Sequence, residues 1–327
     1  MYSIRILSHL QFTTVLLSTF AVIIILCSSI MGNSKIIALD DVPDFSIAAV
    51  GDWGCNPNTS KTIAQIVNSG PSLVIGLGDN SYELTGDCWL NMIHPISMII
   101  HTAFGNHDAS PDLVNQYLKY FKLVRTFYSF NFKNIHFVTI DTNAPLDINS
   151  EQYKFVKNDL EKASSNKSIG WIIPFFHIPA YTTPSGERIL SLFPTEPFAV
   201  TSYDILRNTY QPLFDKYRIK IVLQAHAHNY QRSYPILFNQ ISPSNPIITD
   251  NDSNSYHSPK GEIFLTIGTG GRSLHQFLVS KPPYVITEED TKHGFLSLKF
   301  TNNATSVRGA FYPNDSINPE DEFTIEK

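Results

Sequence analysis

The chain has 327 residues, of which 43% are hydrophobic and 16% are charged, a composition that supports a packed core and argues against a disordered protein. Its 24 basic and 29 acidic residues give a net charge of −5, so it lacks the basic excess expected of a protein that binds nucleic-acid phosphates. Three cysteines are too few for a disulfide scaffold, which leaves a mildly acidic globular protein with 11 histidines.

The N-terminal segment is strongly apolar. Residues 12–32 contain no charged side chain, and Arg5 is the only charged residue before Lys35. A short basic region before an apolar run is typical of a secretory signal peptide, and about twenty apolar residues also suffice to span a bilayer. The sequence therefore predicts that residues 1–33 are either a cleaved signal peptide or an N-terminal membrane anchor. Residues 34–327 are then one exported domain, extracellular or at the cell surface.

Two features bear on that prediction. Residues 34–327 retain only Cys55 and Cys88, which in an oxidising compartment either form a bridge between two loops or stay as thiols. Five Asn-X-Ser/Thr triplets fit an exported glycoprotein, although such triplets also recur by chance; they begin at Asn58, Asn166, Asn251, Asn303 and Asn314.

The remaining chain alternates between apolar strand-like runs and segments with helical spacing. Strands are expected at residues 45–50, 72–77, 100–104, 128–132, 135–141, 169–176 and 219–225, and then at 263–268, 293–300 and 306–312. Helices are expected at 61–68, 89–99, 111–121, 151–163 and 204–217. Residues 128–132 and 135–141 are expected to form a hairpin, residues 179–200 to be irregular, and residues 239–260 to be a surface loop. The pattern predicts an α/β fold with an antiparallel part near its C-terminal end.

Polar clusters follow five of the expected strands. They are Gly51–Gly54, Gly78–Tyr82, Gly105–Asp108, His177 and Ala225–His228. Ligands of open α/β sheets gather beyond the carboxyl ends of the strands, so the five clusters are expected to converge. Carboxylate, phenol, amide and imidazole groups suit first-row transition metals, and the two imidazoles of His226 and His228 are spaced to face one way. No single cluster predicts a metal site, but the set of five does.

In this order the clusters resemble the D-x-G, G-D-x-x-Y, G-N-H-D/E, single-His and G-H-x-H motifs of purple acid phosphatases, which are binuclear metallophosphoesterases. The resemblance extends from Phe45 to Arg232, and residues 267–271 and 293–295 resemble the closing strands of the family. Gly54 and Tyr82 distinguish these enzymes from sister phosphodiesterases. The resemblance implies a four-layer α/β/β/α sandwich of two mixed sheets, the calcineurin-like metallophosphoesterase fold. It also implies the short, single-domain, tartrate-resistant type.

The resemblance also assigns roles to residues of this chain. Asp52, Tyr82 and His228 are similar to ligands of a ferric ion. Asn106, His177 and His226 are similar to ligands of a divalent ion, which is iron, zinc or manganese, and Asp79 is similar to the bridging carboxylate. A phenolate and two carboxylates favour a trivalent ion, and two neighbouring metals can clamp a phosphoryl group and activate a hydroxide for in-line attack.

His107 matches the histidine that contacts phosphate and protonates the leaving oxygen, or else it only orients its neighbours. Asp108 is a candidate to fix the tautomer of that imidazole. Arg232 and Arg272 are candidates for contacts with substrate phosphate or for bracing their loops. The other histidines, at positions 94, 101, 136, 257, 275 and 293, lack ligand spacing, and most of them are expected to be surface or hydrogen-bonded residues.

The chain departs from the family pattern twice. Ala225 stands where a glycine is usual, and the family's further histidine, nine or ten residues after His177, is replaced by Gly186 and Glu187. Tyr181, Glu187 and Arg188 are candidates for the missing contact, or else they have plain loop roles.

The function expected from these observations is that of an exported phosphomonoesterase acting on small phosphorylated substrates. The alternatives are a phosphodiesterase or nucleotide hydrolase of the same fold, and a non-catalytic surface binding protein. No binding to nucleic-acid scaffolds is expected, N-terminal membrane anchoring stays open, and the sequence does not indicate an oligomeric state.

Overall fold

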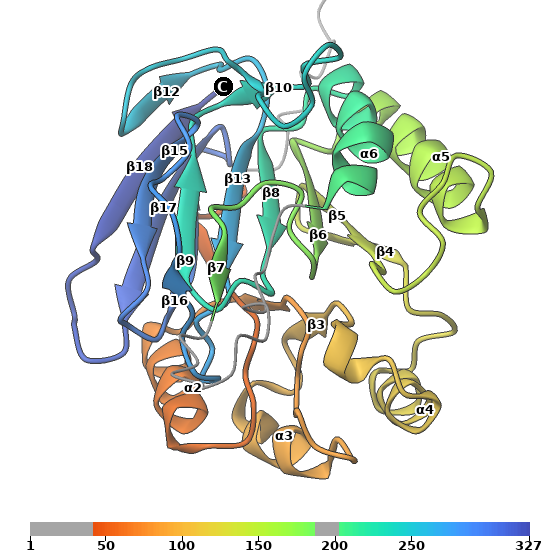
Figure 1. Ribbon diagram of the computed structural model, residues 1–327, viewed down its shortest axis with the longest axis vertical. Coiled ribbons are helices and arrows are strands. Elements are labelled where there is room, and N and C mark those ends of the chain that lie inside the picture. Colours follow the sequence, from red (N-terminus) through yellow and green to blue (C-terminus); the bar gives the residue numbers. More distant parts are fainter. Residues whose placement is uncertain (1–41, 187–202) are drawn as a thin grey trace, which may run out of the picture. The chain divides into compact units, whose positions relative to one another are not determined.

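Two seven-stranded sheets form the centre of the computed structural model, which describes residues 42–186 and 203–327 (Figure 1). The expected N-terminal segment, residues 1–33, and the candidates Glu187 and Arg188 lie outside the described residues. Within residues 42–186 and 203–327, no helix is both long and apolar enough to cross a membrane.

The first sheet has the strand order β12-β18-β17-β16-β1-β2-β3. Its strands β1 to β3 are parallel, and β16 joins antiparallel to β1, followed by the antiparallel β17 and β18. The bounds are β1 Phe45–Val50, β2 Leu73–Gly76, β3 Ile100–Thr102, β12 Ser255–His257, β16 Gly294–Thr301, β17 Ser306–Pro313 and β18 Asp321–Glu326. This sheet is mixed because the C-terminal strands add to its parallel N-terminal half.

The second sheet has the order β15-β9-β13-β8-β6-β5-β4. Its strands β5, β6, β8 and β13 are parallel, whereas β4, β9 and β15 pair antiparallel. The bounds are β4 Ser129–Phe132, β5 Ile135–Ile140, β6 Trp171–Phe176, β8 Ile221–Gln224, β9 Tyr230–Ser233, β13 Ile263–Ile267 and β15 Val285–Glu289. The expected hairpin between β4 and β5, across Lys133 and Asn134, is confirmed.

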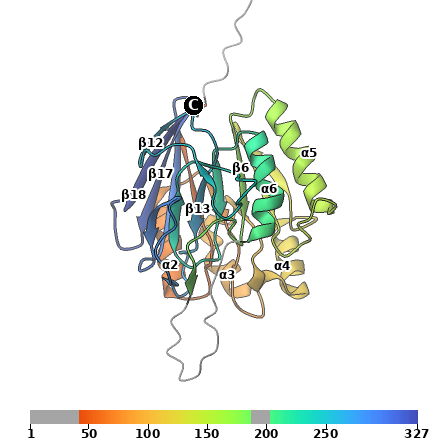
Figure 2. The same ribbon diagram turned by 45° about the horizontal axis from the view of Figure 1, so that its top comes forward.

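Helices form the outer layers (Figure 2). Side chains at the N-caps mark where three of these helices begin. Asn56 accepts hydrogen bonds from two backbone amides of α2, and Ser110 and Ser150 cap α4 and α5. The bounds are α2 Pro57–Ser69, α3 Asp87–Met92, α4 Pro111–Phe121, α5 Glu151–Ser165 and α6 Asp204–Lys216. Helix α2 packs on β16, and apolar residues of α5 and α6 form a core with β5, β6 and β8. The predicted α/β fold with two mixed sheets and outer helices is confirmed.

Two short two-stranded sheets complete the described structure. They pair β7 (Ser185–Gly186) with β14 (Gln276–Phe277) and β10 (Ile236–Leu237) with β11 (Ile247–Ile248). The prediction that residues 239–260 are only a surface loop is therefore wrong in part. This segment contributes β11 and β12, and the Tyr256 side chain of β12 is fully buried.

Arg232 is a buried brace between the sheets. Its Nε and Nη2 atoms donate to the two carboxylate oxygens of Asp321, at 2.6 and 2.7 Å, and thereby join β9 to β18. Both side chains are buried. Of the two roles considered for Arg232, the structure therefore shows the brace: the buried side chain bonds Asp321 and is not exposed to a substrate.

A disulfide joins Cys55 and Cys88, with their Cα atoms 6.1 Å apart and a sequence separation of 33. Cys55 follows the loop after β1, and Cys88 lies in α3. Beneath the bridge the rings of Trp53 and Trp89 pack at 6.3 Å. The bridge thus ties the first polar cluster to α3, as one of the two sequence alternatives proposed.

We expect Cys88→Ser to lower the free energy of unfolding by about 2–4 kcal/mol, because opening this loop frees the unfolded chain. Urea titration followed by tryptophan fluorescence measures the loss. Cys55→Ser and the double variant should each lose the same amount, since each removes the same bridge. A double variant that loses the sum of the two single losses would contradict this assignment.

Candidate metal centre

The polar clusters meet where five strands end. Asp52 follows β1, Asp79 and Tyr82 follow β2, Asn106 follows β3, His177 follows β6, and His226 and His228 follow β8. The first three strands belong to the first sheet and the last two to the second. The predicted convergence is therefore observed, and it takes place between the two sheets.

Asp52, Tyr82 and His228 form one donor group. The Tyr82 hydroxyl donates to Asp52 Oδ1 at 3.0 Å and lies 2.9 Å from His228 Nε2. His228 Nε2 lies 3.3 Å from Asp52 Oδ1. Asp52 and His228 are buried, and Tyr82 is half-buried. Three side chains from both sheets thus direct their donor atoms at one point.

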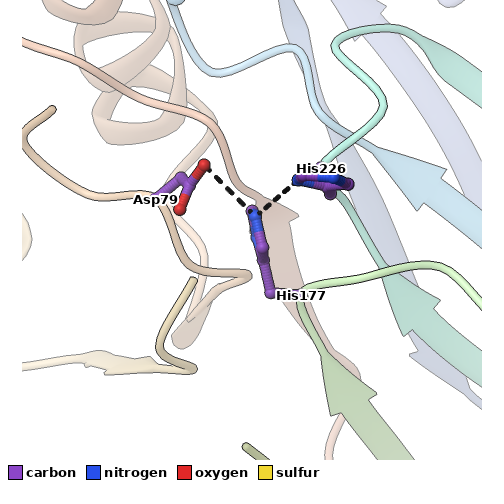
Figure 3. Close-up of side chains that lie close together, drawn as sticks. All are labelled: Asp79, His177 and His226. Carbon is purple, nitrogen blue, oxygen red and sulfur yellow. Dashed lines mark hydrogen bonds and ion pairs between the residues drawn. The ribbon is translucent and has the colours of Figure 1, made fainter. Parts of the chain in front are cut away.

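Asn106, His177 and His226 form the second group. His177 Nε2 lies 3.1 Å from Asn106 Oδ1 and 3.2 Å from His226 Nδ1. Figure 3 shows His177 between Asp79 and His226, with the contacts converging on the imidazole edge. Asn106 is exposed and His226 is half-buried, so this group is more open to solvent than the first.

Asp79 belongs to both groups. Its Oδ1 atom accepts from the His107 backbone amide at 2.8 Å, and its Oδ2 atom lies 3.2 Å from His177 Nε2. One possible ligand atom from each of Asp52, Asp79 and His228 lies within 4.8 Å of the others, and the same holds for Asp79, His177 and His226. Asp79 therefore has the central place predicted for a bridging carboxylate.

The donor atoms fit a cation. His177 Nδ1 lies 2.8 Å from the Leu77 carbonyl and His228 Nδ1 lies 2.7 Å from the Ser273 carbonyl, so each Nδ1 donates and each Nε2 faces the cluster, where a metal ion would take the place of its proton. Asp79 Oδ2 is buried and accepts no hydrogen bond. A buried carboxylate oxygen without a donor is costly, and a metal ion is the partner that these converging lone pairs suit.

The charges of the cluster depend on one another. Burial disfavours a charge on His177, but Asp79 and Asp52 outweigh it and raise the pKa of His177 to about 9. Burial would also raise the pKa of Asp52, but His228 and His177 hold it well below its usual range. Burial and the charge of His177 lower the pKa of His226 to about 4. The cluster therefore keeps its carboxylates ionised and attracts positive charge.

His107 lies at the open side of the cluster. Its side chain is exposed, and its ring packs on the Tyr82 ring with centroids 4.4 Å apart. The prediction that Asp108 fixes the His107 tautomer is wrong. Asp108 is buried, and its two carboxylate oxygens accept from Asn80 and from the Gly105 amide, which closes the turn that carries Asn106.

Arg272 also lies against the Tyr82 ring. Its guanidinium carbon lies 4.7 Å from the centroid of the Tyr82 ring, and its backbone amide donates to the Asp52 carbonyl at 2.9 Å. The Arg272 side chain is exposed, in contrast to Arg232. A cationic group is thus held beside the donor cluster by the loop that follows β13.

His275 is a neighbour that the sequence analysis missed. Its ring stacks on His228 with centroids 3.9 Å apart, and its buried Nδ1 has no hydrogen-bond partner. The expectation that such histidines are exposed or hydrogen-bonded is wrong here. Tyr181, a candidate for the missing family histidine, is instead buried in the core, where its hydroxyl donates to Gln211 Oε1 at 2.6 Å.

A family model described as calcineurin-like phosphoesterase matches residues 45–230 of the chain. Purple acid phosphatase 23 of Arabidopsis thaliana is 24% identical over 75% of this chain and 58% of its own length. These findings confirm the resemblance inferred from the motifs.

Solved structures share the fold. Purple acid phosphatase PPD1 of yellow lupin seeds aligns with a TM-score of 0.71 at 22% identity, covering 87% of this chain and 55% of its own. GAP50, titled the anchor in the inner membrane complex of Plasmodium, aligns with a TM-score of 0.64 at 15% identity, covering 87% of this chain and 89% of its own. The chain spans little more than half the length of the Arabidopsis and lupin proteins.

We expect Gly105→Ala to abolish metal binding, because an added Cβ would lie 2.1 Å from Asp79 Oδ1 and would displace that carboxylate. Metal analysis of the purified protein measures the effect. Gly70→Ala is the control, since it strains a left-handed residue with φ 60° far from the cluster while its Cβ meets no atom within 4 Å, and it should keep its metal. If Gly105→Ala retains a full metal complement, the position deduced for Asp79 is incorrect.

Proposed function

The chain belongs to the calcineurin-like phosphoesterase family, and from this premise we propose that it is an exported, metal-dependent hydrolase of phosphate monoesters. The proposed cofactor is a binuclear centre of Fe(III) and a divalent ion, which is iron, zinc or manganese. Asp52, Tyr82 and His228 are the proposed ligands of the ferric ion. The proposed ligands of the divalent ion are Asn106, His177 and His226, and Asp79 is proposed as a ligand of both ions.

The observation that carries the proposal is the place of Asp79 between two separate donor groups. One group includes a phenol whose oxygen lies 2.9 Å from His228 Nε2, and the other has only neutral amide and imidazole donors. Anionic oxygen ligands favour a trivalent ion, and neutral nitrogen ligands suit a divalent one. Two such ions supply the charge that polarises a phosphoryl group and activates water.

The residues at the mouth of the site have complementary roles in this proposal. His107 and Arg272 both lie against the Tyr82 ring, with the His107 ring centroid 4.4 Å and the Arg272 guanidinium carbon 4.7 Å from its centroid. Arg272 binds the non-bridging phosphate oxygens, for which a guanidinium is well shaped. His107 contacts the phosphate and donates a proton to the leaving oxygen, a contribution of about 10²–10⁴-fold to the rate.

Export is supported by the bridge between Cys55 and Cys88, since stable disulfides are typical of oxidising compartments. The apolar run of residues 12–32 is the proposed export signal, either as a cleaved signal peptide or as a membrane anchor. We therefore place the catalytic domain outside the cell or on its surface.

A second candidate is a non-catalytic surface protein. It is favoured by the likeness to GAP50, the anchor in the inner membrane complex of Plasmodium, of whose length this chain covers 89%. The seven donor side chains of the present chain argue for the enzyme, because a site freed from catalysis need not retain them. Metal content together with turnover distinguishes the two.

We expect the protein purified from a secreting host to contain iron, to absorb visible light, and to hydrolyse p-nitrophenyl phosphate faster than bis(p-nitrophenyl) phosphate. Asp79→Asn should lose about 10³-fold or more of kcat together with one or both metals, because the shared carboxylate holds the centre together. Tyr82→Phe should lose the visible absorption. A colourless, iron-free and active protein would refute the ferric centre, and a preference for the diester would favour the alternative phosphodiesterase.

We expect Arg272→Ala to raise KM for phosphomonoesters about tenfold, the loss of one charge-assisted hydrogen bond, without changing the metal content. Steady-state kinetics and metal analysis measure both quantities. Arg308→Ala, which removes an exposed arginine of β17, is the matched control and should behave as the parent chain. If Arg272→Ala leaves KM unchanged, the side chain only covers Tyr82.

A further inference from the structure

A second concentration of positive charge lies at the other end of β8. A cavity of about 610 Å³ is lined there by Arg218, Lys220, Lys260 and Lys327, together with one carboxylate, that of Asp215. Even with Asp215 ionised, four cations against one anion leave three net positive charges. In a chain with a net charge of −5, this lining is the reverse of the average surface.

None of these four cations forms an ion pair with a carboxylate in the described part of the chain. Lys220 Nζ donates to the Pro259 carbonyl, a neutral partner. Desolvation and the charge of Lys220 lower the pKa of Lys327 to about 8. Burial lowers the pKa of Lys220 too; the nearby Glu262 opposes this shift and Arg218 adds to it. The Lys327 ammonium lies 3.9 Å from the centroid of the Trp171 ring. The positive charge of the cavity is therefore not neutralised by ion pairs with carboxylates.

The fold holds these side chains in place. Arg218 has φ 55° just after α6, where its amide donates to the Asp215 carbonyl at 3.1 Å and the Ile219 amide donates to that of Phe214 at 3.1 Å. Lys220 and Lys260 precede the parallel neighbours β8 and β13, and Lys327 follows β18. Three separate segments thus deliver cations to one edge of the molecule.

We propose that this cavity is a binding site for a small polyanion that carries two or more phosphate groups. A guanidinium and three ammonium groups provide directional donors for phosphate oxygens, and the volume lies in the range of small-molecule sites. From Lys220 to His226 the chain advances six residues, or roughly 20 Å at strand spacing. The polyanion would therefore bind away from the proposed metal centre and need not compete with its substrate.

The phosphate groups belong either to a soluble molecule or to a lipid headgroup, and two probes separate these sources. Myo-inositol hexasulfate is the soluble probe, because sulfate esters imitate the charge of phosphate esters and resist phosphatases. Its binding is measured by calorimetry. Co-sedimentation with phosphatidylcholine vesicles, with and without phosphatidylinositol bisphosphate, is the lipid measurement.

The variant is Arg218→Gln/Lys260→Gln, which removes two exposed charges that have no ion-pair partner among the described residues. The matched control is Lys119→Gln/Lys122→Gln, at the C-terminal end of α4. It removes the same charge, and Lys122 has the same left-handed backbone after a helix, with φ 54°. Phosphatase turnover should stay unchanged in both, since neither pair lies in the proposed centre.

We expect the parent chain to bind at least one probe, and the Arg218→Gln/Lys260→Gln variant to bind it about tenfold more weakly, while the control keeps its affinity. Binding of the hexasulfate alone identifies a soluble polyanion, and added binding to the phosphoinositide vesicles identifies a headgroup. Equal affinity in parent and variant, equal loss in the control, or no binding to either probe would overturn the proposal. A chain without turnover that still shows the expected difference would refute the proposed function and leave this site intact.

Discussion

The burial of two carboxylates, Asp52 and Asp79, is the constraint on which the arrangement of the centre depends. A buried carboxylate is tolerated only where donors or cations surround it, and neither sheet supplies these alone. Asp52 Oδ2 accepts from the His226 backbone amide at 2.8 Å, so a residue of the first sheet is satisfied by the second. The Gly51 amide donates to the Ile267 carbonyl at 2.9 Å and joins the two sheets directly beside it. The sheets therefore meet where the carboxylates need partners.

The backbone bears a cost for this arrangement. Asp52, Asp79, Tyr82 and His226 all have φ between 51° and 68°, the left-handed region that side chains other than glycine seldom adopt. These strained residues are held by backbone hydrogen bonds between the strand ends, such as those from the Asp52 and Trp53 amides to the Gly78 and Asp79 carbonyls, each 3.0 Å long. Four of the seven proposed ligands share this strain. The left-handed backbone directs their side chains toward the cluster, and it does not stabilise the fold. The stabilisation from the Cys55–Cys88 disulfide and from the packed rings of Trp53 and Trp89 offsets part of this backbone strain.

The parallel half of the fold and the convergence of the strand ends were predictable, because both follow from local pattern. Residues 45–50 and 111–121 were predicted to the residue, since an apolar run and an N-terminal proline mark their bounds. Strand β18 was missed because only two of the residues of Asp321–Glu326, Phe323 and Ile325, are apolar, and the segment is defined as a strand by its pairing with β17. The brace from Arg232 to Asp321, 89 residues apart, and the stacking of His275 on His228 depend on contacts that no local spacing encodes. Asp108 was misjudged for a related reason, since its donors are the Gly105 amide of its own turn and Asn80 of the loop after β2, not the adjacent imidazole.

A protein with a net negative charge repels phosphate at long range, so the proposed affinity for phosphate requires positive charge at the binding sites themselves. At the carboxyl end of β8 the carboxylates of Asp52 and Asp79 require cations, which then attract a phosphoryl group. At the amino end of β8 the side chains of Arg218, Lys220, Lys260 and Lys327 are themselves the cations. Charges separated through solvent by more than a Debye length of about 8 Å are largely screened at physiological ionic strength. The two ends of one short strand can therefore attract different anions, because neither site relies on the field of the whole protein.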